Sequence, residues 1–395
     1  MQYVLGNMLN GGGGLNPDGL SLDLQFAADK TLTARRGPTP TFTRASSATF
    51  VGSDGLIQTA ATNIPRFDHT SAGVCRGLLI EDSRTNICLQ SENFGTTWAA
   101  GGCAVSVNTD VSPDGSTTAD RVNITNGGGH FLAQNIAVTA STAYTFSFWV
   151  KRGTATALSY SLVNNTTASN IVAPTSYYNQ TSSTWTRVSF TFTTPVGCTN
   201  IGIYPLRDGG STGTVLLWGA QLEAGSFPTS YIPTTTGSVV RSADVCSITG
   251  SDFTSVYNES EHTLFAQASG MSHANFGSYL SFDNGTANEQ SAIGGFPAPN
   301  RAVCYVVDGG TTQASPELSV TLNQNNKMAA GIKLNSFQLA VNNVLGTQDN
   351  AGTMPTANIL KIGRAWNSNT ISGTYAQVKI YKKRLSNAKL QALTV

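Results

Sequence analysis

Apolar and polar residues alternate over many short stretches of the chain, which is the pattern of half-buried β-strands. Residues 144–150 (YTFSFWV) and 186–192 (TRVSFTF) show this alternation clearly. Turn residues separate such stretches every ~10–15 residues, as in antiparallel sandwiches. Asp54-Gly55 and Asn284-Gly285 are hairpin signals between two such stretches. The pattern predicts an all-β protein with several antiparallel sheets.

The stretches group into four units. Residues 1–20 are rich in glycine and asparagine and are expected to form an arm, because glycine loses the most entropy when it is ordered. Residues 21–88 are interpreted as a small β-rich module. Residues 89–245 and residues 246–395 each carry enough predicted strands for an antiparallel β-sandwich of the jelly-roll kind.

Composition narrows the classes of protein that fit this pattern. Charged residues make up 11% of the chain, against about 25% in an average globular protein. The 23 basic and 22 acidic residues leave no basic excess, so nucleic-acid binding is not expected. Charged helix formers are scarce, and the single helix signal is Ser386 as N-cap of residues 387–393.

Neither secretion through a signal peptide nor membrane insertion is expected. Residues 1–5 (MQYVL) lack the basic and apolar regions of a signal peptide, and no stretch approaches the ~18 apolar residues of a membrane span. We therefore expect synthesis in a cytoplasm. The six cysteines are scattered without metal-ligand spacing, which favours buried free thiols over a disulfide framework.

Several short motifs, in fixed order, resemble a module of bacteriophage and prophage tail-fibre and head-fibre proteins. They are TFTRASSATF (41–50), DGL (54–56), NIPRFD (63–68), GLLIE (77–81) and RTN (84–86). The resemblance implies that residues 21–88 attach the protein to other virion proteins.

The two following units resemble sandwich families. Residues 89–245 resemble carbohydrate-binding-module-like jelly rolls through SENF (91–94) with Trp98, PDGSTTAD (113–120), WGAQLE (218–223), GSFPTSYIPT (225–234) and RSAD (241–244). Residues 246–395 resemble concanavalin A or laminin-G sandwiches through LKIGR (360–364) and GTYAQVKIY (373–381), followed by Leu385-Ser386. The resemblances imply these folds in a virion.

No catalytic residues are predicted. Glycan hydrolysis needs two carboxylates on either side of the scissile bond, about 5–10 Å apart. The third unit has few acids and lacks the Glu-x-Asp-x-x-Glu arrangement of hydrolytic concanavalin-like enzymes. We therefore expect a protein that is not an enzyme.

Aromatic and amide residues in loop-like contexts are the candidates for glycan binding, because aromatic faces stack on sugar rings and amides bind hydroxyls. The candidates are Tyr177, Tyr178, Trp185, Trp366, Asn367 and Asn369. The alternative for these aromatics is packing within the sandwich or against another subunit.

A structural calcium ion is the only cofactor considered. Asp114, Asp120 and Glu223 are its candidate ligands, because calcium prefers oxygen ligands. The alternative is that Asp114 belongs to a turn and Glu223 is an internal hydrogen-bond acceptor.

These observations predict a non-enzymatic bacteriophage virion protein exposed on the particle surface after synthesis in the host cytoplasm. It would be a fibre-like or tail-associated appendage, anchored by its N-terminal module, that contacts host surface glycans through its sandwiches. A homo-oligomer is expected, and a trimer is favoured. The alternative is a decoration or cement protein of the capsid or tail, since the chain is short for a fibre and lacks coiled-coil heptads. A depolymerase is the third and weakest hypothesis.

Overall fold

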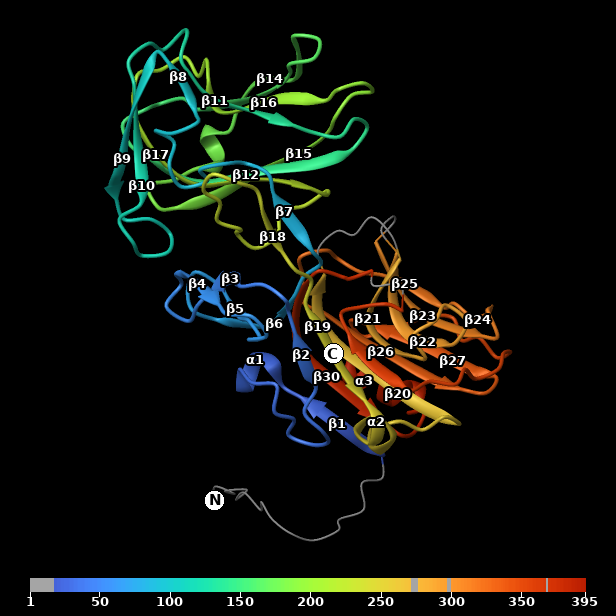
Figure 1. Cartoon of the computed structure of the whole chain (residues 1–395). Coiled ribbons are helices and arrows are strands. Elements are labelled where there is room, and N and C mark those ends of the chain that lie inside the picture. Colours follow the sequence, from blue (N-terminus) through green and yellow to red (C-terminus); the bar gives the residue numbers. More distant parts are fainter. Residues whose placement is uncertain (1–17, 271–275, 297–299, 367–368) are drawn as a thin grey trace, which may run out of the picture.

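Strands dominate the computed structural model, which describes residues 18–270, 276–296, 300–366 and 369–395 (Figure 1). The predicted all-β fold class is confirmed. The first 17 residues of the expected N-terminal arm lie outside the described residues.

The larger of two sandwiches consists of two antiparallel sheets. Sheet I contains, in spatial order, β28 (Val344–Leu345), β27 (Ser336–Val341), β26 (Asn326–Lys333), β20 (Glu261–Gly270), β30 (Gly373–Tyr381), β6 (Cys75–Ile80) and β5 (Phe67–His69), and β1 (Leu20–Leu24) also pairs with β30. Sheet II contains β2 (Thr41–Thr43), β19 (Val245–Thr249), β29 (Ile359–Ile362), β21 (Gly277–Asp283), β22 (Gln290–Phe296), β23 (Arg301–Asp308) and β24 (Thr311–Ala314), and β25 (Glu317–Ser319) also pairs with β23. We call it the composite sandwich, because each sheet combines strands from both ends of the chain.

The residues expected as an N-terminal module therefore share their sheets with the C-terminal unit. Strand β1 pairs with β30 from Leu20 to Leu24, β6 pairs with β30, and β2 pairs with β19. In Figure 1 these blue strands lie against the yellow and red ones. Only the hairpin of β3 (Ala48–Val51) and β4 (Ile57–Ala60) forms a sheet of its own, and Asp54-Gly55 lies in its turn as predicted.

The second sandwich is inserted in the sequence between the N-terminal and the C-terminal strands of the composite sandwich. Its sheet III contains β15 (Thr186–Thr193), β12 (Ala143–Arg152), β17 (Gly213–Ala224), β10 (Ala119–Ile124) and β9 (Cys103–Asp110). Its sheet IV contains β14 (Ser169–Ser176), β13 (Ser159–Asn164), β16 (Asn200–Arg207), β11 (Phe131–Ala137) and β8 (Ala99–Gly101). The chain enters and leaves this inserted sandwich through a ribbon of β7 (Arg84–Asn86) and β18 (Val239–Arg241).

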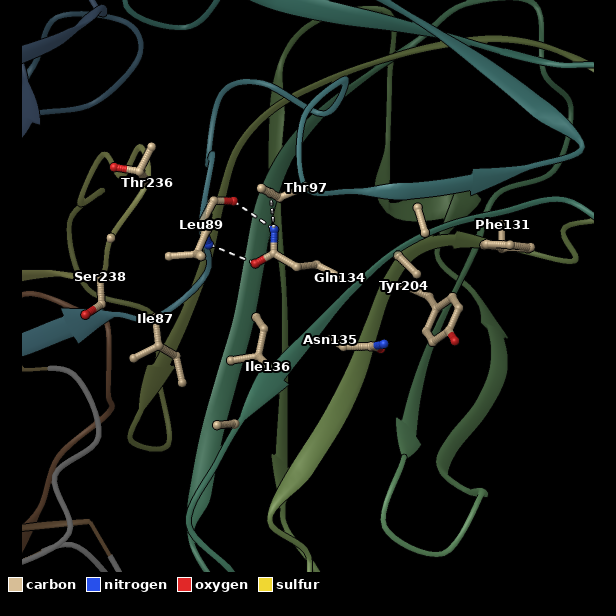
Figure 2. A pocket seen from close by; sticks show the side chains of 14 residues that line it. Ile87, Leu89, Thr97, Phe131, Gln134, Asn135, Ile136, Tyr204, Thr236 and Ser238 are labelled. Carbon is tan, nitrogen blue, oxygen red and sulfur yellow. Dashed lines mark hydrogen bonds between the residues drawn. The ribbon is translucent and has the colours of Figure 1, made fainter.

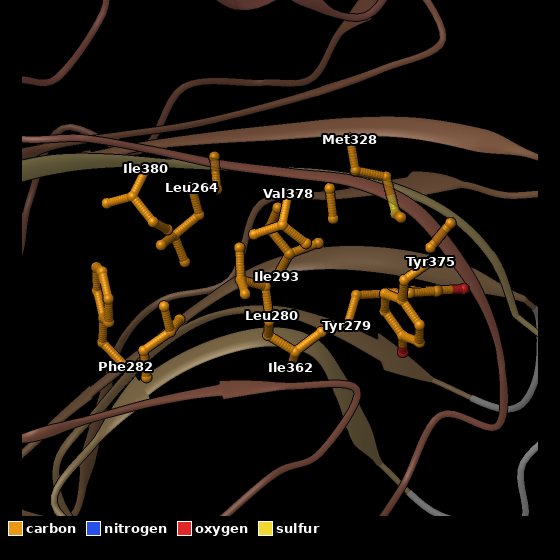
Figure 3. Packing of buried hydrophobic residues seen from close by; sticks show 14 of the residues in the cluster. Leu264, Tyr279, Leu280, Phe282, Ile293, Met328, Ile362, Tyr375, Val378 and Ile380 are labelled. Atoms are coloured by element: carbon orange, nitrogen blue, oxygen red, sulfur yellow. The ribbon is translucent and has the colours of Figure 1, made fainter. Parts of the chain in front are cut away.

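Each sandwich has its own hydrophobic core. In the composite sandwich, side chains of sheet I face those of sheet II (Figure 3), among them Leu264, Met328, Val378 and Ile380 from sheet I and Leu280, Phe282, Ile293 and Ile362 from sheet II. Leu22, Leu78 and Ile80 from the N-terminal strands belong to the same core. The core of the inserted sandwich draws its buried residues from positions 88–222 alone.

The helices are short. They are α1 (Phe26–Asp29), α2 (Gly250–Val256), α3 (Asn387–Leu393) and the 3-10 helix η1 (Tyr178–Gln180). Helix α3 matches its prediction, since Ser386 Oγ accepts a hydrogen bond from Lys389 N. Helix α2 was not predicted, because it begins at Gly250 and has no side-chain cap. In the described part of the chain, no helix has the length and apolar character needed to cross a membrane.

Candidate functional site

Two of the predicted glycan-binding tyrosines serve other roles. Tyr177 is only 1% exposed, and its hydroxyl donates a hydrogen bond to Pro205 O at 2.8 Å. Its ring packs in the core of the inserted sandwich, so a sugar cannot stack on it. The guanidinium of Arg152 stacks on one face of the Tyr178 ring, 4.6 Å from its centroid. The loop context that suggested these residues is the 3-10 helix η1, which directs Tyr177 inward.

The other predicted glycan-binding residues do not form one surface. Trp185 donates from Nε1 to Val111 O at 2.9 Å and packs beside Trp218 and Tyr231 in the inserted sandwich. Trp366 is half-buried and belongs to the composite sandwich, as does Asn369. Asn369 donates to Phe276 O at 2.9 Å, and Asn367 lies outside the described residues.

The three candidate calcium ligands act as internal hydrogen-bond acceptors. Asp120 accepts from the backbone N–H groups of Phe94 (2.6 Å) and Asn108 (2.9 Å). Asp114 accepts from the hydroxyls of its turn, and Glu223 accepts from the backbone N–H and the hydroxyl of Thr229. No group of three or more His, Cys, Asp or Glu residues in the described ranges could hold a metal ion. These contacts match the alternative, in which Asp114 belongs to a turn and Glu223 is an internal hydrogen-bond acceptor.

Charged residues from three of the virion-type motifs and from RSAD (241–244) meet in one buried cluster. Asp244 contacts Arg44 at 3.1 Å and Arg66 at 2.6 Å, and Glu81 contacts Arg66 at 2.8 Å and also Arg241. All five side chains are at most 1% exposed. Burial by itself would raise the pKa of Glu81, but Arg241 and Arg66 hold that pKa well below its usual range. The cluster is closed to solvent and therefore offers no ligand site. Its ion pairs join segments that are far apart in the sequence.

An open groove of about 790 Å³ lies on the inserted sandwich, along β11. We call it the first groove. Its lining residues are Ile87, Leu89, Thr97, Ala99, Phe131, Ala133, Gln134, Asn135, Ile136, Ala137, Tyr204, Thr236, Gly237 and Ser238. Figure 2 shows the rings of Phe131 and Tyr204 at one end of the groove and Thr236 and Ser238 at the other.

The aromatic end of the first groove is built by β11 and β16. Phe131 is 37% exposed, and its ring lies 6.3 Å from that of Tyr204 in an edge-to-face arrangement. Gly202 makes room for Tyr204, because a Cβ there would lie 2.7 Å from a carbon of the tyrosine ring. The guanidinium of Arg207 stacks on Tyr204, 4.5 Å from its centroid. The two rings form a platform for an apolar ligand face.

Side-chain amides continue the first groove from this platform. Asn135 is exposed on β11 and accepts from Asn165 Nδ2 at 2.9 Å, and Asn165 also donates to Asn200. Gln134 accepts from Leu89 N at 2.8 Å and donates to Leu89 O at 2.9 Å, as Figure 2 shows. Gln134 thus fixes one wall, while Asn135 presents its amide to the groove.

The lining of the first groove carries no charged side chain among its 14 residues. It combines exposed aromatic rings with amides and the hydroxyls of Thr97, Thr236 and Ser238. A pocket of this size with a few polar groups beside apolar surface is the usual form of a small-molecule site. The arrangement suits a neutral ligand that has both apolar faces and hydroxyl groups.

Comparison with known proteins connects this sandwich to a family. Residues 90–204 match the family model of a carbohydrate binding domain. This segment contains β11, the first part of β16 as far as Tyr204, and most of the residues that line the first groove. No curated protein matches the sequence significantly.

Solved structures with similar folds include a sialidase module and two proteins of other kinds. The CBM40 module of the Ruminococcus gnavus IT-sialidase, bound to α2,3-sialyllactose, is 17% identical, and the match covers 35% of this chain and 83% of that chain with a TM-score of 0.31. Tailspike protein 4 of bacteriophage CBA120 is 15% identical over 35% of this chain and 21% of that chain, with a TM-score of 0.29. A structure described as a receptor binding domain is 12% identical over 39% of this chain and 40% of that chain, with a TM-score of 0.31.

Sequence reasoning missed Phe131, Asn135 and Tyr204. A signal was present in residues 201–204, where Ile201 and Ile203 alternate with Gly202 and Tyr204. If the isoleucines face the core, Tyr204 must point outward. Phe131 and Asn135 are exposed on β11, and only the pairing of β11 with β16 brings them together with Tyr204.

Proposed function

We propose that this protein binds neutral glycans in the first groove and has no enzymatic activity of its own. The observation that carries the proposal is the pairing of the Phe131 and Tyr204 rings beside the amide of Asn135, inside a segment that matches a carbohydrate binding domain. Sugar rings have apolar faces that stack on aromatic rings, and their hydroxyls both donate and accept hydrogen bonds, as carboxamides do.

Glycan binding by a single-residue variant tests the proposal directly. In Tyr204→Ala we expect affinity for glycans on an array to fall about tenfold or more, because half of the aromatic platform is lost. The matched control is Tyr305→Ala, which removes a half-buried tyrosine from β23 of the composite sandwich. Equal binding by Tyr204→Ala and the wild type, or no binding by the wild type to any glycan, would contradict the proposal.

We further propose that the protein acts on a virion, as a fibre-like or tail-associated appendage that attaches to host surface glycans. The support is the ordered set of virion-type motifs in residues 41–86. In this role it would be a homo-oligomer, with a trimer favoured. Quantitative mass spectrometry of particles from the encoding phage or prophage should find a few copies of the protein per particle. Many copies on a regular lattice would favour the decoration role instead, and absence from particles would exclude both.

The absence of catalysis is itself part of the proposal. The chain should release no reducing sugar from any polysaccharide that it binds on the array. Release that persists in repurified protein would show that the protein is a depolymerase.

A further inference from the structure

A second groove, of about 780 Å³, lies on the outer face of sheet I in the composite sandwich. Helix α3 covers the part of this face that carries Phe265, Ala329 and Tyr381. Elsewhere the face is open, and β20, β30 and β6 form the floor of the second groove. Its walls are α1, the β5–β6 hairpin and residues 323–325.

Side-chain amides converge on the second groove. Six of its lining residues are carboxamides, namely Gln25, Gln267, Asn323, Gln324, Asn325 and Gln377. Gln267 and Gln377 lie directly opposite each other on β20 and β30. Their neighbours Ala266 and Val378 point into the core, so the two glutamines point outward into the groove. No hydrogen bond within the described residues engages either glutamine side chain.

An acid and a base add polar groups at one wall. Asp68 Oδ1 accepts from Val51 N at 2.9 Å, while Oδ2 lies 3.8 Å from Arg76 Nη1, beyond hydrogen-bond distance. Oδ2 can therefore accept from a ligand, and Arg76, whose side chain is 54% exposed, can donate to one. These are the two charged residues of the lining, and their charges cancel.

The chemistry of this lining selects one class of occupant. A peptide strand cannot extend the floor, because β20 and β30 are paired on both sides by other strands. A polyanion would need a basic excess, and Arg76 is balanced by Asp68. An apolar ligand would leave the amides unpaired. A polyol remains, because each hydroxyl both donates and accepts, which matches carboxamides and a carboxylate.

We infer that the second groove is a separate binding site for a neutral saccharide, recognised through its hydroxyls by Gln267, Gln377 and Asp68. It lacks an aromatic platform, so recognition depends on hydrogen bonds and not on stacking. The chain would then hold two glycan sites, one in each sandwich.

Cys75 offers a direct test, because this half-exposed thiol lines the second groove. The full chain would be alkylated with N-ethylmaleimide in the presence of neutral oligosaccharides derived from dextran, mannan, galactan, arabinan, xylan and starch. We expect at least one of them to slow the alkylation of Cys75 several-fold. Cys103, the other half-exposed thiol, contacts Phe131 O at 3.2 Å beside the first groove, so it serves as the internal reference in Tyr204→Ala, where that groove is disabled.

The variant Gln267→Ala/Gln377→Ala assigns any protection to the second groove. The oligosaccharide concentration that halves the alkylation rate of Cys75 should be about tenfold or more higher in this variant than in the wild type, since two hydrogen-bonding side chains are lost. Gln180→Ala, which removes an exposed glutamine of the inserted sandwich, should behave as the wild type. Failure of every neutral oligosaccharide to protect Cys75, protection by dextran sulfate alone, or equal protection in the double variant would each overturn the inference.

The experiments distinguish failure of the proposed first site from failure of the proposed second site. The alkylation is repeated in Tyr204→Ala, which disables the first groove alone. Protection of Cys75 that survives there supports the second site, whatever the array shows for the first. Glycan binding that is lost in Tyr204→Ala while Cys75 is never protected supports the first groove and rejects the second.

Discussion

His262 is a buried histidine that makes the stability of the composite sandwich depend on pH. Its side chain is fully buried in β20, with Nδ1 3.0 Å from Asn258 O and Nε2 2.9 Å from Ser291 Oγ. Burial lowers the pKa of His262 from 6.5 to about 4, because the interior disfavours the charged ring. The neutral ring can donate to the carbonyl and accept from the hydroxyl, so both contacts are satisfied without a charge.

The sign of the resulting pH effect follows from proton binding. Between pH 6.5 and 4 the unfolded chain binds a proton at His262 and the folded chain does not, so stability falls as the pH is lowered. The full loss is on the order of 3 kcal/mol. Thermal unfolding from pH 7.5 to 4 should show this loss in the wild type and much less of it in His262→Gln. An identical pH dependence in the two proteins would contradict the prediction.

At the scale of elements, Gly77 allows an N-terminal strand to enter a sheet formed mainly by C-terminal ones. Its φ is +116°, and a Cβ there would lie 2.0 Å from Tyr375 O on the neighbouring strand β30. Neither the backbone conformation nor the space admits a side chain. Gly77 thus makes possible the close pairing of β6 with β30.

Substitution of Gly77 tests the importance of this pairing. We expect Gly77→Ala to lower the free energy of unfolding by more than ~2 kcal/mol, through backbone strain and the displaced strand. The control Gly128→Ala has no atom within 4 Å of the added Cβ and should change stability by less than about 0.5 kcal/mol. Chemical denaturation followed by circular dichroism measures both. Equal stability of the two variants would contradict the prediction that position 77 requires glycine.

At the scale of the whole molecule, the composite sandwich is one folding unit interrupted by a second one. Its core combines Leu22, Leu78 and Ile80 with residues after position 245. The buried ion cluster adds long-range links, because Glu81 and Asp244 bind arginines from both sides of the insertion. Removing one partner of such a buried pair leaves an uncompensated charge, so the cluster strongly favours this one arrangement of the segments.

Excised fragments should follow these boundaries and not the order of units along the chain. We expect residues 87–238 to fold alone, since they contain the complete core of the inserted sandwich. Residues 245–395 alone should not fold, whereas a chain joining Asn86 to Val239 through a short turn should, because these residues are already paired between β7 and β18. Circular dichroism melts of the three fragments measure this, and cooperative melting of 245–395 alone would contradict it.

Local patterns in the sequence were sufficient for the class of structure. Period-two alternation identified strands such as β12 and β15, Asp54-Gly55 marked a hairpin, and Ser386 marked the start of α3. These features depend on residues a few positions apart, and the preferences of turns, caps and pleated strands act over that distance.

Only the tertiary structure decided which strands share a sheet and which side chains share a groove. Strand β1 pairs with residues about 360 positions later, and no local pattern specifies such a partner. Tyr177 looked like a loop residue until packing placed it in the core, and only the pairing of β11 with β16 placed Tyr204 beside Phe131 on the outer face. Alternation says that two faces differ, whereas burial and binding depend on what packs against each face, which is set by contacts between distant parts of the chain.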